Sequence, residues 1–342
     1  MISVPLPHKK KYYKHVLIIG PQTEIPYYIQ LLKEKTHKSV RITGIVTYEG
    51  VTGKVDSRRV LGTVNEFEKI LNNHLIDSVF IISDTFPHFE KAKEIIKLCE
   101  EEGIETSLIT EFYKELAQKG MYDELYNIIY GMPIFNYNPG ISPAGKAIKR
   151  AGDVILSIIA LILLTPLFIL IILLIKLDSP GPAIFKQTRV GEHGRHFEIY
   201  KFRTMYEFAA KKKASLLKHS EVDGPVFKME NDPRITRVGK LLRKWSVDEM
   251  LQFHNVLRGE MSLVGPRPAL PSEVEKYKSW YRKRLSVKPG IMCLWQVEKR
   301  CATGFEEWMR SDIYYVDHWS LWLDFTILIR AIPAVIFGKG AK

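Results

Sequence analysis

The chain has 342 residues, of which 46% are hydrophobic and 26% charged, and this composition excludes a disordered chain and a single small module. Lys and Arg number 50 against 38 Asp and Glu, so the net charge of +12 predicts an anionic partner such as nucleic acid, a membrane surface or a phosphorylated substrate. Three cysteines exclude a disulfide scaffold, and a mean hydropathy of −0.08 excludes a multi-span membrane protein.

Residues Met1–Lys14 contain no apolar run and predict no secretory signal peptide, and short apolar strands then alternate with amphipathic helices over 15–115. The expected strands are His15–Ile19, Val40–Thr47, Ser78–Ser83 and Glu105–Ile109, and the expected helices are Glu24–Lys35, Asn65–Asn73 and His88–Glu102. Because such alternation is typical of parallel sheets, residues 1–130 are expected to form a doubly wound, Rossmann-like α/β domain. The first strand ends in Gly-Pro-Gln-Thr and not in G-x-G-x-x-G, which favours a module that binds nothing, or an unidentified ligand, over a dinucleotide site.

The stretch 131–145 contains three prolines and three glycines, and this composition predicts a linker between two domains. A membrane segment over 146–178 and a basic region over 179–342 are expected after it. No internal repeat or low-complexity tract interrupts this order.

The segment from Val154 to Ile175 carries no charge over 22 residues. As a straight helix it would extend about 33 Å, which is enough to cross a hydrocarbon core of about 30 Å. Thr165 and Pro166 interrupt it, because Pro166 has no N–H for the carbonyl of Ile162 and disfavours helical angles at Thr165. Each half would then be too short to span the bilayer alone.

Basic residues flank this segment on both sides: Lys146, Lys149 and Arg150 precede it, and Lys176, Lys186 and Arg189 follow it. Since positive charge marks the cytoplasmic side of a membrane helix, both flanks are predicted to be cytoplasmic. A re-entrant helix-break-helix, which enters and leaves by the same leaflet, satisfies both observations. A single spanning helix with a proline kink is the alternative.

Residues Ser246 to Arg258 have the apolar spacing of an amphipathic helix, and Ser246 with Glu249 forms an S-x-x-E capping box. Asp248 and Glu249 in the first turn therefore have a structural interpretation, in which they only complement the helix dipole. In the functional interpretation, Asp248 is held ionised as a nucleophile, the helix N–H groups receive phosphate, and Glu249 helps to hold a divalent cation.

Four basic residues near this helix are candidates to contact phosphate. Arg243 lies five residues before Asp248, and Arg267 lies in a rigid Gly-Pro-Arg-Pro loop, so each is a candidate for bidentate contact with phosphate oxygens. Lys201 and Arg203 add positive charge. Phosphoryl chemistry needs such a set of a nucleophile, a cation and guanidinium groups.

The last element, Trp319 to Phe337, is apolar but contains Asp324 and Arg330. Trp319, Trp322 and Phe325 fall near one side of the expected helix. Such a helix fits a membrane interface, and burial against the rest of the domain is an equal alternative.

From Lys149 to the C-terminus the chain resembles the bacterial sugar transferase family, monotopic polyprenyl-phosphate phosphoglycosyltransferases that begin surface-glycan assembly. The resemblance depends on several motifs in a fixed order. They are Lys149-Arg150-x-x-Asp153, Gly181-Pro182, Tyr200-Lys201-Phe202-Arg203-Thr204-Met205, Asp232-Pro233-Arg234-Ile235-Thr236, Ser246-Val247-Asp248-Glu249, Asn255-Val256-Leu257-Arg258-Gly259, Ser262-Leu263-Val264-Gly265-Pro266-Arg267-Pro268 and Trp319-Ser320-Leu321-Trp322-Leu323-Asp324.

The resemblance implies a mainly helical, monotopic catalytic domain on the cytoplasmic side of the bacterial inner membrane. It implies that Asp248 attacks the β-phosphate of a UDP-sugar, releases UMP and carries the phosphosugar until undecaprenyl phosphate accepts it. It also implies that Asp248 and Glu249 position Mg²⁺, that Arg243 and Arg267 contact phosphate, and that the chain forms a homodimer. The products would be exopolysaccharide, lipopolysaccharide or capsule.

The segment 289–300 departs from the family pattern, because Met292, Cys293 and Lys299 replace small residues. If this segment shapes the sugar or uridine pocket, the substrate preference differs, and Gln296 and Arg300 are weaker site candidates. The four membrane helices that precede the Rossmann-like module in the longer subfamily are not expected in this chain.

Three other functions fit parts of the pattern. A nucleotide-sugar glycosyltransferase would attack the anomeric carbon and release UDP instead of UMP. An inactive membrane scaffold is compatible with the altered segment 292–300, although the intact pair of Asp248 and Glu249 argues against it. Nucleic-acid binding would use the positive charge, but no nucleic-acid-binding motif supports it.

Overall fold

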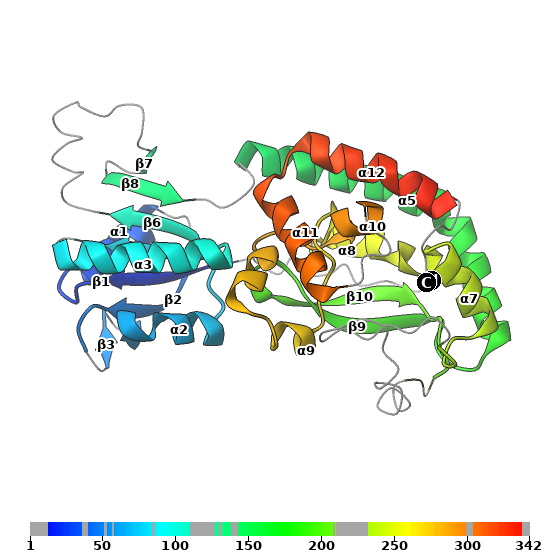
Figure 1. The fold of residues 1–342 in the computed structure, drawn as a ribbon, viewed down its shortest axis with the longest axis horizontal. Coiled ribbons are helices and arrows are strands. Elements are labelled where there is room, and N and C mark those ends of the chain that lie inside the picture. Colours follow the sequence, from blue (N-terminus) through cyan, green and yellow to red (C-terminus); the bar gives the residue numbers. More distant parts are fainter. Residues whose placement is uncertain are drawn as a thin grey trace. The chain divides into compact units, whose positions relative to one another are not determined.

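The computed structural model describes residues 13–35, 40–50, 53–56, 58–83, 86–109, 127–129, 132–137, 143–207, 209, 232–298 and 304–336. The chain divides into two compact units, Met1–Pro139 and Gly140–Lys342 (Figure 1). Each unit is described by itself below.

The first unit is built on one sheet with the strand order β3-β4-β2-β1-β5-β6-β8-β7 (Figure 1). Its strands are β1 (Lys14–Gly20), β2 (Val40–Thr47), β3 (Lys54–Val55), β4 (Arg58–Thr63), β5 (Ser78–Ile82), β6 (Glu105–Ile109), β7 (Asn127–Ile129) and β8 (Met132–Tyr137). The pairs among β4, β2, β1, β5 and β6 are parallel, and β3, β8 and β7 add antiparallel pairs at the edges.

Side chains of β1 alternate between two cores. Val16 and Ile18 pack with α1 (Ile25–Lys35), whereas Leu17 and Ile19 pack with α2 (Phe67–Asn73) and α3 (Phe86–Glu102). Burial of both faces explains why the strands are almost uninterrupted apolar runs. The expected mixed α/β structure with a parallel sheet is confirmed.

The structure differs from the sequence expectation at 131–145. Met132–Tyr137 forms β8, which pairs antiparallel with β6, and a helix already begins at Pro143. The strand contains Pro133 near its start, and its other residues include Ile134, Phe135 and Tyr137, which favour strands. The glycine and proline content of 131–145 predicted a linker, whereas part of this stretch forms a short strand.

The second unit begins with α5 (Pro143–Asp178), which contains Pro166. The expected break into two helices is not found, and α5 continues as one helix that changes direction along its length (Figure 1). The Thr165 hydroxyl donates a hydrogen bond to the carbonyl of Leu161 at 2.6 Å, so a side chain supplies a donor next to the proline.

Within the described residues, α5 is the one helix that is long and apolar enough to cross a membrane, judged by length and composition. Only 17% of its most apolar window is buried inside the protein. A core helix of a soluble domain would be mostly buried, so the exposed apolar face of α5 needs another apolar environment. Its buried face packs Phe168, Ile171 and Ile175 against Phe202 and Leu242.

A hairpin and short helices form the rest of the second unit (Figure 1). The elements are β9 (Ile184–Val190), η2 (Glu192–Gly194), β10 (His196–Phe202), α7 (Arg237–Lys244), η4 (Val247–Gln252), α8 (Phe253–Arg258), β11 (Ser262–Val264), α9 (Pro271–Val274), η5 (Ser279–Ser286), β12 (Gly290–Met292), α10 (Leu294–Glu298), α11 (Phe305–Asp317) and α12 (Leu321–Ile336).

The carboxylate of Asp324 ties α12 to α5 and α11. It accepts hydrogen bonds from Lys149 Nζ at 2.5 Å, the Tyr315 hydroxyl at 2.7 Å and the Trp319 indole at 3.1 Å, while Lys149 also donates to the carbonyl of Val264. One side of α12 is thus buried, but Trp322 is 73% exposed, and Phe325 is also exposed. Burial against the rest of the domain is therefore confirmed for one face of this element, and the membrane-interface interpretation of the exposed face stays a prediction.

Because Lys149 and Asp324 are almost fully buried, removing one partner leaves a buried charge uncompensated. We expect Lys149→Met and Asp324→Leu each to lower the free energy of unfolding by about 3–5 kcal/mol. The double variant should be destabilised by less than the sum, as measured by denaturant unfolding in detergent micelles. Additive losses would show that the two side chains do not act as a pair.

Candidate active site

The segment after α7 differs from the expected capped helix. Ser246 has left-handed backbone angles (φ 53°, ψ 23°) and makes no side-chain cap, so the predicted capping box is wrong. The predicted helix Ser246–Arg258 is also divided into the 3-10 helix η4 and the α-helix α8. The physical reason is Glu249, whose carboxylate accepts a charge-assisted hydrogen bond from Lys201 Nζ of β10 at 2.6 Å instead of turning back to the backbone.

Asp248, the other acid of the pair, differs from Glu249 in its contacts. Within the described part of the chain, no other side chain forms a hydrogen bond or ion pair with its carboxylate, and the backbone N–H of Asp248 itself is the one group that contributes a hydrogen bond. Burial and the negative charge of Glu249 raise the pKa of Asp248 to about 6, against the opposing charges of Lys201 and Arg243. The expectation that its environment favours ionisation is therefore wrong, but a carboxyl group with this pKa is still mostly ionised at neutral pH.

Glu249 has the opposite electrostatic environment. Burial alone would raise its pKa, but the positive charges of Lys201 and Arg267 outweigh burial and lower the pKa to about 2. The two adjacent acids thus differ in environment: Glu249 is stabilised in its ionised form and held by Lys201, whereas no basic side chain of the described residues forms an ion pair with Asp248. Such divergence between neighbouring titratable groups is characteristic of active sites.

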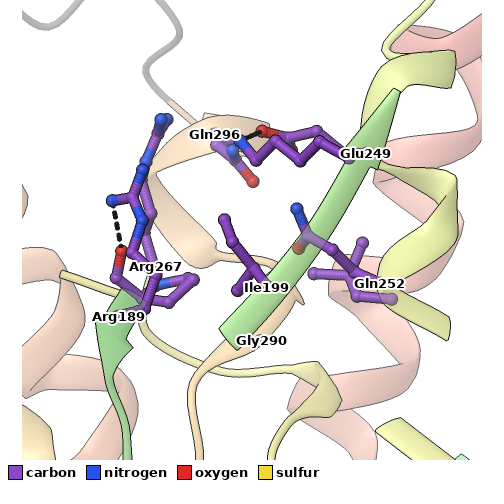
Figure 2. A pocket seen from close by; sticks show the side chains of 10 residues that line it. Arg189, Ile199, Glu249, Gln252, Arg267, Gly290 and Gln296 are labelled. Carbon is purple, nitrogen blue, oxygen red and sulfur yellow. Dashed lines mark hydrogen bonds and ion pairs between the residues drawn. The ribbon is translucent and has the colours of Figure 1, made fainter. Parts of the chain in front are cut away.

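Glu249 lines a pocket together with three basic residues, Arg189, Lys201 and Arg267, and Figure 2 shows Arg189 and Arg267 on the side of the pocket opposite Gln252. The other lining residues are Ile199, Gln252, Pro268, Gly290, Ile291 and Gln296. The three cations exceed the single carboxylate of the lining, so the pocket fits an anionic ligand.

The three arginines predicted to contact phosphate differ in exposure and in hydrogen bonds. Arg267 is exposed, and its guanidinium makes no hydrogen bond in the described part of the chain, so it is free for a ligand. Arg243 donates from Nε to the Thr204 hydroxyl at 3.0 Å, and its charge acts on Asp248. Arg203, in contrast, is buried and donates to the carbonyls of Ser179 and Pro180, which gives it a structural role.

The remaining predicted site residues are Gln296, Arg300, Thr165 and Pro166. Gln296 lines the pocket, and its Oε1 also accepts a hydrogen bond from the Cys293 N–H at 3.1 Å. Arg300 lies outside the described residues. Thr165 and Pro166 belong to α5 and are not among the residues that line the pocket.

Sequence reasoning missed two pocket residues, Arg189 and Gln252. Arg189 was counted only as a charge flanking the membrane segment, yet it is buried, with Nη1 donating to the carbonyl of Pro268 at 2.9 Å. The signal was its place in a strand that pairs with the strand of Lys201, because β9 and β10 are antiparallel neighbours.

A buried ion pair between Arg284 and Asp312 fixes the loop that carries Arg267. Arg284 donates to the carboxylate of Asp312 at 2.5 Å and to the carbonyl of Arg267 at 2.6 Å. The same loop passes very close to β12, since a Cβ at Gly290 would lie 2.1 Å from the nitrogen of Gly265. Only glycine fits there, and the close approach holds Arg267 at the rim of the pocket.

The described residues contain no group of three or more His, Cys, Asp or Glu side chains that could hold a metal ion. The pair of Asp248 and Glu249 still fits Mg²⁺, because this ion is often held by one or two carboxylates together with phosphates of the substrate. Lys201 occupies one oxygen of Glu249, and the Asp248 carboxylate is free.

Comparison with known proteins connects this site to one family. The model of the family described as bacterial sugar transferase matches residues 144–338. The chain is 44% identical over 221 residues to the galactosyl transferase CpsE of Streptococcus agalactiae, covering 64% of this chain and 48% of that protein. It is 39% identical over 205 residues to the exopolysaccharide production protein ExoY of Sinorhizobium fredii, covering 59% of this chain and 91% of that protein.

A third relative is the UDP-glucose:undecaprenyl-phosphate glucose-1-phosphate transferase of Escherichia coli K12, 37% identical over 221 residues, which are 62% of this chain and 45% of that protein. The chain thus spans about half the length of this relative and of CpsE, and nearly all of ExoY.

Substitution by methionine is expected to lower the free energy of unfolding at Arg203 but to leave it almost unchanged at Arg267. Arg203→Met removes a buried guanidinium with several hydrogen bonds and should lower the free energy of unfolding by about 2–4 kcal/mol. Arg267→Met removes an unbonded, exposed group and should change stability by less than about 0.5 kcal/mol while weakening binding of pyrophosphate. Denaturant unfolding and equilibrium dialysis measure the two effects, and a large stability loss for Arg267→Met would contradict the assignment.

Proposed function

Because the chain belongs to the bacterial sugar transferase family, as its motifs predicted, we propose that it transfers a sugar-1-phosphate from a UDP-sugar to undecaprenyl phosphate. This reaction would start the assembly of a surface polysaccharide or glycoconjugate. The printed names of the relatives support the reaction class, since they include an undecaprenyl-phosphate galactose phosphotransferase of Salmonella typhimurium and the glucose-1-phosphate transferase of E. coli.

The observation that carries this proposal is a half-buried carboxylate, Asp248, that no basic side chain of the described residues pairs with and that directly precedes Glu249 of the cationic pocket. An oxygen of Asp248 attacks the β-phosphorus, the phosphoanhydride bond breaks, and UMP leaves with the bridging oxygen. An oxygen of undecaprenyl phosphate then attacks the phosphorus of the aspartyl-phosphosugar, and Asp248 leaves as a carboxylate. The covalent intermediate divides one difficult displacement into two easier ones.

The basic residues of the site stabilise the charge that develops on phosphorus. Arg267 is free to contact phosphate oxygens from the rim, and Arg243 is placed to act beside Asp248. Lys201 holds Glu249, and since no basic side chain of the described residues pairs with Asp248, Asp248 is available to approach the donor. When bound, Mg²⁺ would neutralise pyrophosphate charge, and Asp248 and Glu249 would hold it.

We further propose that α5 is a re-entrant membrane helix and that both units lie on the cytoplasmic side of the bacterial inner membrane. The exposed apolar face of α5, its change of direction and the basic residues on both flanks support this placement. Residues 1–130 would form a Rossmann-like regulatory or dimerising domain, supported by the parallel strands and the helices on both sheet faces.

The assay for this function incubates membranes that contain the chain with undecaprenyl phosphate, Mg²⁺ and a panel of UDP-sugars. Wild type should release UMP, and Asp248→Asn should lose at least about a thousandfold in rate because the nucleophile is gone. Release of UDP would indicate a glycosyltransferase instead. No product with any donor would favour an inactive scaffold, and full activity of Asp248→Asn would refute the covalent mechanism.

The membrane placement is tested by labelling single cysteines added at either terminus of a variant without native cysteines. Both should resist impermeant thiol reagents in intact cells and react after lysis. Labelling of one terminus from outside would instead show that α5 spans the membrane.

A further inference from the structure

Gln252 differs from other buried amides of the site. Only 3% of the residue is exposed, and its side-chain amide makes no hydrogen bond in the described part of the chain. One helical turn later, Asn255 is also buried, but its amide donates to the carbonyl of Glu198 and to the carboxylate of Glu260 and accepts from the Tyr200 N–H.

The amide atoms of Gln252 keep some access to solvent, since they do not belong to the fully buried side-chain atoms that have no hydrogen-bond partner. An amide that is almost enclosed and makes no hydrogen bond within the protein is still uncommon, because little water reaches it to compensate. Asn255 has the partners of a structural amide, since it joins α8 to β10. Gln252 contributes no such link, so its hydrogen-bonding capacity is available to a molecule outside the chain.

The position of Gln252 identifies that molecule as the occupant of the cationic pocket. Gln252 lies three residues after Glu249 on η4, and both line the pocket. Figure 2 shows its amide turned toward the centre of the pocket, beside Ile199. The wall around it contains Ile199, Gly290 and Ile291, whereas the cations Lys201 and Arg267 are the groups suited to phosphate.

The chemistry of an amide narrows the contact further. Phosphate oxygens only accept hydrogen bonds, and the lining contains Arg267, a cation without a hydrogen-bond partner in the described residues, that is suited to them. An amide offers a donor and an acceptor side by side, which matches a neutral group that also has both. In a nucleotide sugar such groups are the sugar hydroxyls and the edge of the uracil ring.

We propose that Gln252 is a substrate-binding residue that determines specificity by hydrogen-bonding a neutral group of the nucleotide sugar, either a sugar hydroxyl or the uracil edge. This inference rests on the proposed function, because it takes a UDP-sugar as the ligand. It adds to that function a residue that recognises the sugar or the uracil of the donor, whereas the basic residues are proposed to contact its phosphates.

The test measures ligand affinity with Gln252→Met, which keeps the length of the side chain and removes its hydrogen bonds. Both parent and variant carry Asp248→Asn, so that a bound donor does not react. Equilibrium dialysis with UDP, UDP-galactose, UDP-glucose and UDP-N-acetylgalactosamine should show about a 5- to 50-fold loss of affinity for the donor that the parent binds best. Gln22→Met, at an exposed glutamine of the first unit, is the control and should leave every affinity unchanged.

A contact of Gln252 with the sugar and a contact with uracil predict different results. If Gln252→Met weakens UDP-sugar binding but not UDP binding, Gln252 contacts the sugar. If it weakens both by the same factor, Gln252 contacts uracil. Unchanged affinity for every ligand would overturn the assignment of Gln252 alone, whereas a parent that binds no UDP-sugar would overturn the proposed function and this inference with it.

Thermal unfolding of the ligand-free chain separates binding from a structural role. Gln252→Met should leave Tm unchanged or raise it, because an apolar side chain of similar shape replaces an unsatisfied amide. Asn255→Leu should lower Tm, because it removes three hydrogen bonds of a buried amide. A lower Tm for Gln252→Met together with unchanged affinities would assign Gln252 a structural role and overturn the proposal.

Discussion

Lys201 and Glu249 approach to 2.6 Å between β10 and η4, and this ion pair determines how the site is arranged. The Glu249 carboxylate bonds Lys201 and does not form a capping box with Ser246, which has left-handed backbone angles. It also keeps Glu249 ionised, and the charge of Glu249 together with burial raises the pKa of its neighbour Asp248. Lys201 therefore holds one acid and not the other, and the proposed roles of Asp248 as nucleophile and of Glu249 as cation ligand use this difference.

The scaffold around this pair depends on buried polar links between short elements. Asp324 joins α12 to α5 through Lys149, and Asp312 holds Arg284 beneath the loop of Arg267. Short helices and two-stranded sheets bury little apolar surface of their own, so these ion pairs define which arrangement of the elements is stable. The same links connect the exposed apolar helix α5 to the body that carries the candidate site, since Lys149 of α5 pairs with Asp324 of α12.

Local pattern was enough to predict the strands and helices of the first unit, since alternation of apolar runs and amphipathic helices has few other solutions. It was also enough to bring Asp248, Glu249, Lys201 and Arg267 together as candidates. It failed where a tertiary partner competes with a local one: Ser246 lost its capping role to Lys201, Arg203 turned to the carbonyls of Ser179 and Pro180, and α5 remained one helix at Pro166. Arg189 and Gln252 were missed because burial and the absence of a partner become visible only in three dimensions.

The central claim is that Asp248 forms a covalent bond to the phosphosugar, and the most direct measurement is mass spectrometry of the purified chain incubated with its UDP-sugar and Mg²⁺ in the absence of undecaprenyl phosphate. The account predicts that the chain gains the mass of one sugar phosphate, that the modified peptide contains Asp248, and that adding undecaprenyl phosphate removes the modification. An unmodified chain that still releases UMP when the lipid is added, or a modification on a residue other than Asp248, would contradict the account.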